Sequence, residues 1–109
     1  GLGDVYKRQP QIADKKIVEN QGDIEYHEMW HMKQAENFRS QKGKITKENH
    51  REYIQSACKD AKKVIDKAGI SKYNVNKVSE YAERMYRLGR YDEVEAEYMT
   101  TYRRKRHGN

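Results

Sequence analysis

The chain has few of the residues that cross-link a protein or anchor it in a membrane. Its 109 residues include one cysteine, Cys58, so neither an intrachain disulfide nor a cysteine-based zinc cluster can form. No apolar run is long enough to cross a membrane, and no signal peptide is visible. Phenylalanine and tryptophan each occur once against nine tyrosines. We therefore expect a thin core rich in tyrosine, with Cys58 as a small residue within it.

Charged residues are plentiful and mostly basic. They make up 37% of the chain against 35% for apolar residues, and the net charge is +6. The length allows one small domain. Part of the basic excess lies at residues 103–106, which indicates either a contact with a polyanion or, as we favour, a solvated helix end whose cations complement the helix dipole. Because no groove-reading motif accompanies this run, nucleic-acid binding is disfavoured.

Apolar residues recur at helical spacing over most of the chain, so we predict an all-α fold of about four helices. The complete protein would then be α+β, with this chain as its C-terminal helical part. We expect residues 1–9 to be a non-native read-through segment and residues 10–22 to be a loop or remnant strand. The helical domain is expected at residues 23–104, followed by a basic tail at residues 105–109.

Capping residues mark the ends of the predicted helices. Asp23, Asn74 and Asp92 are expected as N-caps of the first, third and fourth helices, and Thr46 is expected to open the second. Glycines are expected to end the first three helices, as residues that readily adopt the left-handed conformation; they are Gly43, Gly69 and Gly89.

The strongest chemical signal is His27-Glu28-Met29-Trp30-His31, an H-E-x-x-H motif in the first predicted helix. Residues four apart share a helix face, so the two imidazoles can bind one zinc ion. Glu28 would then be the general base that takes a proton from the metal-activated water. Both histidines share a face with apolar residues, where imidazoles without partners are costly. The alternative, which we disfavour, is a pair of core histidines hydrogen-bonded to neighbours.

A third zinc ligand is expected on another helix, because a catalytic site usually has three protein ligands and one position for water. His50 is expected at the surface and His107 in the charged tail. Glu95 lies on the apolar stripe of the fourth predicted helix, where a carboxylate needs a metal or a cationic partner. We predict Glu95 as the ligand, with an ion pair to lysine or arginine as the alternative. Glu93 and Glu97 are expected to be solvated.

The motif and the later glutamate resemble the gluzincin metallopeptidases. The stretch E-V-E-A at residues 93–96 is similar to the E-x-E-A pattern of small zincins of mobile elements, in which the second glutamate is the ligand. The resemblance implies zinc bound by His27, His31 and Glu95, with Glu28 as general base. It also implies that the helical domain at residues 23–104 is zincin-like and acts on a peptide or protein substrate.

Residues 23–102 are also similar to the C-terminal part of minor capsid or head morphogenesis proteins of phages and prophages. This second resemblance implies phage head proteins as partners, and the host cytoplasm or the virion as location. Zincins also carry a small sheet before the motif helix, which would lie upstream of this chain. They use a tyrosine or histidine to stabilise the oxyanion. Tyr91, Tyr86 and Tyr102 are candidates for that role, with core packing as the alternative.

Two further functions stay open at this point. One is a non-catalytic phage head-associated domain, in which the metal site is structural or vestigial. The other, less favoured, is a helical nucleic-acid-binding module that stacks bases on tyrosines. Because the tyrosines fall mostly on apolar stripes, a core role for them is preferred.

Overall fold

The structure, a computed structural model, describes residues 21–106 of the chain and the side chains of residues 23–103. Its elements are the helices α3 (Gln21–Lys42), α4 (His50–Lys67), α5 (Glu80–Arg87) and α6 (Tyr91–Arg106), with the 3-10 helix η1 (Val75–Lys77) before α5. No strand occurs in this described part, so the all-α prediction is confirmed. None of its helices combines the length and apolar character that a membrane span needs.

Several sequence expectations fall on residues that the structure does not describe. The proposed read-through segment at residues 1–9 and most of the proposed loop at residues 10–22 lie outside the described residues, as does His107. At the other end, α6 continues to Arg106, so the first two residues of the expected basic tail are helical.

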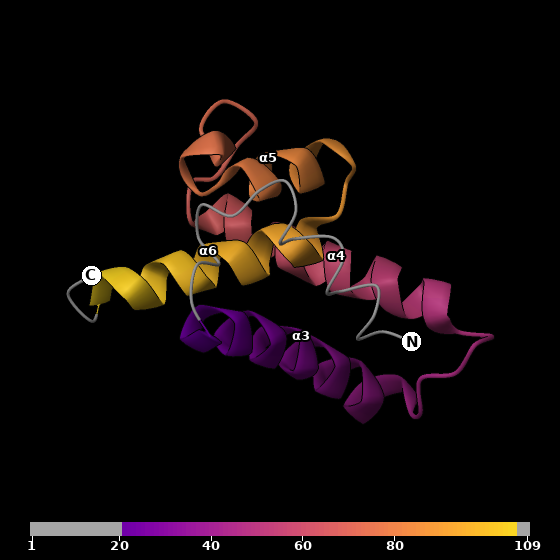
Figure 1. The fold of residues 1–109 in the computed structure, drawn as a ribbon. Helices are drawn as coiled ribbons and strands as arrows, with labels where there is room; N and C mark the ends of the chain where they lie inside the picture. The colour runs from indigo at the N-terminus through magenta and orange to yellow at the C-terminus, as the bar shows by residue number, and fades with distance from the viewer. Residues whose placement is uncertain (1–20, 107–109) are drawn as a thin grey trace.

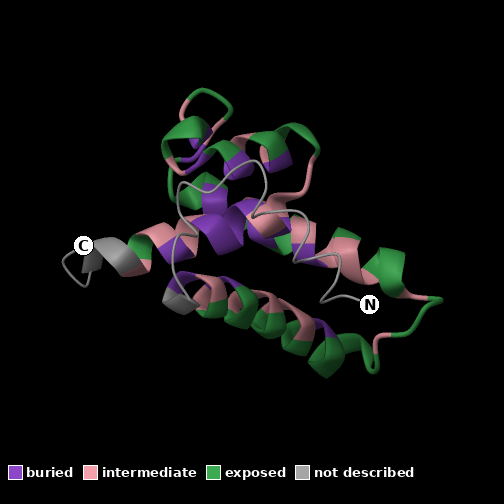
Figure 2. Ribbon diagram, viewed as in Figure 1, coloured by how far each residue is buried: buried purple, intermediate pink, exposed green. Residues whose placement is uncertain are grey.

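Helix α6 lies at the centre of the fold and packs against α3, α4 and α5 (Figure 1). Buried residues gather on its first half, where the ribbon is mostly purple (Figure 2). An amphipathic helix buries one stripe, but three neighbours cover more than one face of α6. They bury consecutive residues on it, which are Val94, Glu95, Ala96 and Glu97.

The apolar core lies where α4, α5 and α6 meet, and it is small and contains tyrosine, as expected. Its fully or nearly fully buried members are Ile65, Ile70, Val75, Tyr81, Ala82, Met85 and Val94. Tyr86 and Tyr91 pack against this core and against each other, edge to face, with ring centroids 5.2 Å apart. The structure therefore places these two tyrosines in the packing role that was the alternative to oxyanion stabilisation.

Gly69 lies just past the end of α4, where the sequence predicted a helix-ending glycine. Gly69 has a φ of +84°, and the N–H groups of Gly69 and Ile70 donate to the carbonyls of Asp66 and Ile65. These bonds satisfy the last carbonyls of the helix, which is the usual role of a glycine just past a helix end.

The second predicted helix starts later than expected and the third, which begins after Asn74 as expected, is interrupted; at both places side chains bind nearby backbone. Thr46 and Asn49 each accept the other's backbone N–H, at 3.2 and 2.7 Å, which closes a turn before α4 begins at His50. The third predicted helix is interrupted, since Ser79 accepts the N–H of Ala82 at 2.9 Å and starts α5 anew. Short polar side chains compete with continuous helix in this way.

The two expected aspartate caps serve other purposes. Helix α3 begins at Gln21, so Asp23 lies inside its first turn, where it is buried and 3.7 Å from a guanidinium nitrogen of Arg103. Helix α6 begins at Tyr91, and the buried carboxylate of Asp92 binds Arg90 at 2.8 Å. Both aspartates thus contact arginines from positions inside their helices.

Candidate metal centre

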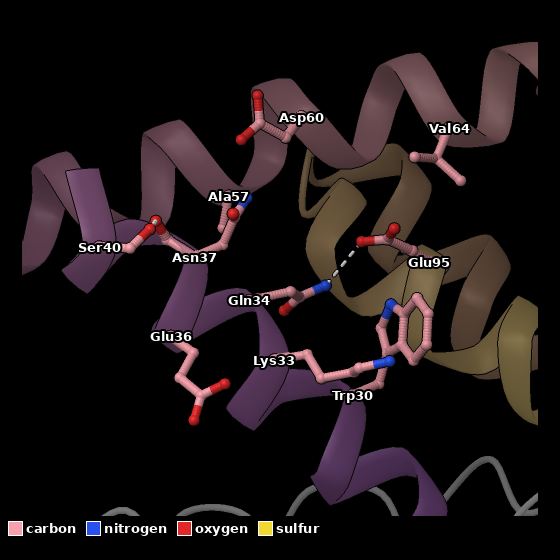
Figure 3. A pocket seen from close by; sticks show the side chains of 10 residues that line it. All are labelled: Trp30, Lys33, Gln34, Glu36, Asn37, Ser40, Ala57, Asp60, Val64 and Glu95. Atoms are coloured by element: carbon pink, nitrogen blue, oxygen red, sulfur yellow. Dashed lines mark hydrogen bonds between the residues drawn. The ribbon is translucent and has the colours of Figure 1, made fainter.

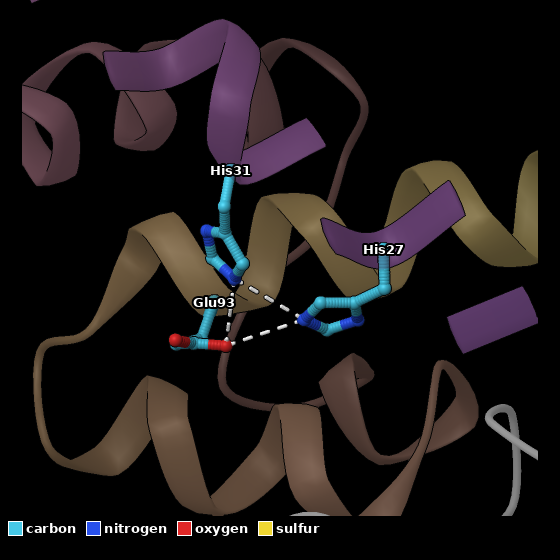
Figure 4. Close-up of side chains that lie close together, drawn as sticks. All are labelled: His27, His31 and Glu93. Atoms are coloured by element: carbon cyan, nitrogen blue, oxygen red, sulfur yellow. Dashed lines mark hydrogen bonds and ion pairs between the residues drawn. The ribbon is translucent and has the colours of Figure 1, made fainter. Parts of the chain in front are cut away.

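The two motif histidines, His27 and His31, point from α3 toward α6, where they contact the carboxylate of Glu93 (Figure 4). The Nε2 atoms of His27 and His31 are 3.2 Å apart. The Oε1 atom of Glu93 lies 3.3 Å from the first and 3.1 Å from the second. Within the described side chains, these three form the one group of ligand type close enough to hold a metal ion together.

These separations fit a zinc ion. Ligand atoms on a tetrahedral ion with bonds of about 2.0–2.1 Å lie roughly 3.3–3.4 Å from one another. The three atoms are therefore near the edges of such a tetrahedron before any ion is bound. Two imidazoles and one carboxylate are also a donor set that zinc accepts, and it leaves a fourth position free.

The cluster is mostly closed to solvent. His27 is 1% exposed, whereas the side chains of His31 and Glu93 are 21% and 13% exposed. The solvent-exposed side of the cluster is therefore the side of His31 and Glu93.

A proton can occupy the cluster when no metal does. Burial opposes a charge on His27, but the hydrogen bonds to Glu93 and Glu97 outweigh it and raise its pKa to about 9. Burial likewise opposes the charge of Glu93, but contacts with His27 and His31 hold its pKa well below the usual range. The metal-free cluster is thus a charged imidazolium beside a carboxylate.

The stability of the metal-free protein is expected to fall as the pH rises from about 6.5 to about 9. His27 loses its proton near 6.5 in the unfolded chain and near 9 in the fold. Its raised pKa therefore stabilises the fold fully below 6.5, and this contribution, about 3 kcal/mol at most, is lost as the pH passes 9. Because His27 and Glu93 form one ion pair, their contributions are not added. Urea denaturation with a chelator present, repeated across this pH range, measures the effect; a flat profile would contradict the ion pair.

Both histidines also have partners on their outer nitrogens. Nδ1 of His27 is 2.8 Å from Oε2 of Glu97, an ion-pair contact between two side chains that are almost completely buried. The other oxygen of Glu97 accepts the hydroxyl of Ser79 at 2.6 Å. Nδ1 of His31 lies 2.9 Å from Oε1 of Gln34. Each imidazole is therefore held from two sides.

Glu95, predicted as the third ligand, lies apart from the cluster. It is 7% exposed, and its carboxylate accepts the amide of Gln34 at 2.8 Å. Burial raises its pKa, although the hydrogen bond from Gln34 opposes this effect. Glu95 lines an open pocket of about 680 Å³ between α3 and α4, together with Trp30 and Gln34 (Figure 3). The structure thus brings Glu93 to the histidines where the sequence predicted Glu95.

The expectation that Glu93 and Glu97 are solvated is wrong. Their side chains are 13% and 2% exposed, and both contact His27. They are four residues apart on α6, as His27 and His31 are on α3, so each pair lies on one helix face. The matching four-residue spacing of two histidines and two glutamates was the sequence signal for this contact.

A tyrosine that the sequence did not indicate contacts the cluster, whereas the predicted base Glu28 is exposed to solvent. Glu28 is exposed on α3, directly after His27. The hydroxyl of Tyr81 donates to Oε1 of Glu93 at 3.1 Å, although Tyr81 is only 3% exposed. Burial, and then the negative charge of Glu93, raise the pKa of Tyr81, so its hydroxyl keeps its proton as a donor. Tyr102, another expected candidate, is exposed.

Comparisons of the chain with protein-family models, with curated proteins and with solved structures return no match. The resemblances to gluzincins and to phage head proteins therefore stay predictions from the residues themselves.

Proposed function

We propose that the chain is the helical part of a zinc-dependent metallopeptidase of gluzincin type, with His27, His31 and Glu93 as zinc ligands. The observation that carries the proposal is the convergence of the H-E-x-x-H histidines with a glutamate from a later helix, their three ligand atoms 3.1–3.3 Å apart. A helix with this motif and a second helix with a carboxylate are the parts that the resemblance implies. The glutamate differs by two positions from the one expected.

Zinc, when bound, lowers the pKa of the water in its open position and polarises a carbonyl. The resemblance gives Glu28, the exposed residue after His27 on α3, the role of general base, which accepts a proton and passes it to the leaving amine. The hydroxyl of Tyr81 donates its one proton to Glu93 and so helps to orient the carboxylate that would hold zinc. The substrate would be a peptide or protein, entering on the solvent side of His31 and Glu93.

The proposal is tested by metal content and metal-dependent turnover. The purified chain is expected to contain about one zinc, because one three-ligand site is present. A chelator should remove the zinc and with it any hydrolysis of a mixed peptide substrate, and added zinc should restore both. Elemental analysis and mass spectrometry of the peptides measure these results. A protein free of zinc after exposure to excess metal would overturn the proposal.

The burial of the cluster favours a second candidate, a non-catalytic phage head-associated domain with a structural metal. His27 and Glu97 are almost completely buried, and the cluster joins α3 to the central helix α6. A metal buried between two helices would stabilise their contact, because its binding energy contributes to folding. This candidate predicts that zinc removal lowers the melting temperature while no peptide is hydrolysed in either state.

A further inference from the structure

We propose that Glu97 and Gln34 are positioning residues of the metal centre, which hold His27 and His31 as the tautomers whose Nε2 lone pairs face the metal. The inference rests on the metal centre of the proposed function. It adds a role for two side chains that touch no metal ligand atom directly, and it connects that centre to the start of α5.

The contact between His27 and Glu97 determines the first tautomer. Both ring nitrogens of His27 face a carboxylate, and a carboxylate cannot donate a proton. Nδ1 has the shorter contact, an ion-pair distance of 2.8 Å to Oε2 of Glu97 outside hydrogen-bond geometry, against 3.3 Å from Nε2 to Oε1 of Glu93. Because Oε1 of Glu93 already accepts the hydroxyl of Tyr81, we infer that the neutral ring keeps its proton on Nδ1. A neutral ring protonated at Nδ1 has its lone pair on Nε2, the atom that faces His31 and Glu93. Because the side chains of His27 and Glu97 are 1% and 2% exposed, water does not offer either of them a competing partner.

Glu97 is itself held in place by the helix cap of α5. The hydroxyl of Ser79 accepts the backbone N–H of Ala82 at 2.9 Å and donates its proton to Glu97 at 2.6 Å. The one hydroxyl proton of Ser79 is therefore donated to Oε1 of Glu97, and Oε2 of Glu97 faces His27. The start of α5 thus orients Glu97, and Glu97 orients His27.

Gln34 determines the second tautomer. Its amide nitrogen donates to two acceptors, the backbone carbonyl of Asp92 at 3.1 Å and the carboxylate of Glu95 at 2.8 Å. This fixes which end of the amide is oxygen, and that oxygen faces Nδ1 of His31 at 2.9 Å. His31 can then donate from Nδ1 to Gln34, which leaves its Nε2 lone pair for the metal beside Glu93. Outer partners of this kind typically change metal affinity by about 10–100-fold.

The test is Glu97→Gln, which keeps the shape of the side chain and exchanges one oxygen for an amide. Ser79 still donates to the remaining oxygen, so the amide nitrogen faces Nδ1 of His27 and the ring shifts its proton to Nε2. Zinc affinity, measured by competition with a coloured chelator, is expected to fall about 10–100-fold. The control is Asp23→Asn, which also removes the charge of a buried carboxylate between α3 and α6, but one that contacts Arg103. The control should keep zinc affinity within about threefold, whatever its melting temperature.

Nitrogen NMR of the metal-free proteins separates this inference from the proposed function. In the neutral His27 ring, wild type is expected to show the proton on Nδ1, toward Glu97, and Glu97→Gln to show it on Nε2, toward Glu93. Wild type with the proton on Nε2 would overturn the inference, and so would equal zinc affinities for wild type and Glu97→Gln. A wild type that binds no zinc would overturn both the proposed function and the positioning role, while the tautomers would still report whether Glu97 orients His27.

Discussion

Glu93→Ala is expected to lose zinc at metal concentrations that saturate Glu95→Ala. Zinc sites contribute about 10 kcal/mol or more, so one of three ligands accounts for roughly 3 kcal/mol, or about 100-fold or more in affinity. Glu93 supplies a ligand atom 3.1–3.3 Å from both imidazole nitrogens, whereas Glu95 reaches only the amide of Gln34. Calorimetric titration with zinc measures both variants against wild type.

These two variants control for each other. Each removes a mostly buried carboxylate from α6, two residues apart, so a general loss of packing should affect both. Glu95→Ala frees the amide of Gln34 and is expected to cost at most about tenfold through His31. The opposite result, with zinc lost from Glu95→Ala and kept by Glu93→Ala, would restore the ligand predicted from the sequence and leave the observed cluster as an ion pair.

Glu28→Gln is expected to reduce peptide hydrolysis about 100- to 10,000-fold, the usual contribution of a general base, without loss of zinc. The amide keeps the shape of the side chain but cannot accept a proton at neutral pH. Because Glu28 is exposed, the free energy of unfolding should change by no more than about 0.5 kcal/mol. Turnover per zinc ion, with metal content determined on the same sample, measures the effect.

Glu36→Gln is the matched control for this variant, since Glu36 is another exposed glutamate of α3. It should keep full turnover. If Glu28→Gln were as active as wild type, Glu28 would not be the base; if both variants lost activity equally, the loss would come from the charge of α3 rather than from proton transfer.

The helical fold could be predicted because its periodic apolar residues and its helix-ending glycines act locally. The breaks before α4 and α5 were not predicted, since they depend on which of several short polar side chains binds the backbone. Ser79 does so between η1 and α5, and Thr46 and Asn49 do so together before α4. Such competition is decided by geometry within a few residues that composition does not determine.

The histidine ligands could be predicted because their spacing lies within one helix. The glutamate could not, because D-E-V-E-A-E places a carboxylate on nearly every face of α6 and the choice depends on its neighbours. The sequence argument assumed that one stripe of α6 is buried. In the structure α3, α4 and α5 all contact α6, so Glu93, Glu95 and Glu97 all lie inside, each against a different partner.

The antiparallel contact between α3 and α6 also sets how far one helix can slide along the other. Asp23 meets Arg103, His27 meets Glu97 and Glu93, and Gln34 meets Glu95. Sliding α3 by one turn, about 5.4 Å, in either direction would take an imidazole away from one of the two buried carboxylates. A buried carboxylate without a partner costs several kcal/mol, whereas apolar surfaces tolerate such shifts. The polar cluster therefore selects one helix register among those that the small apolar core alone would allow.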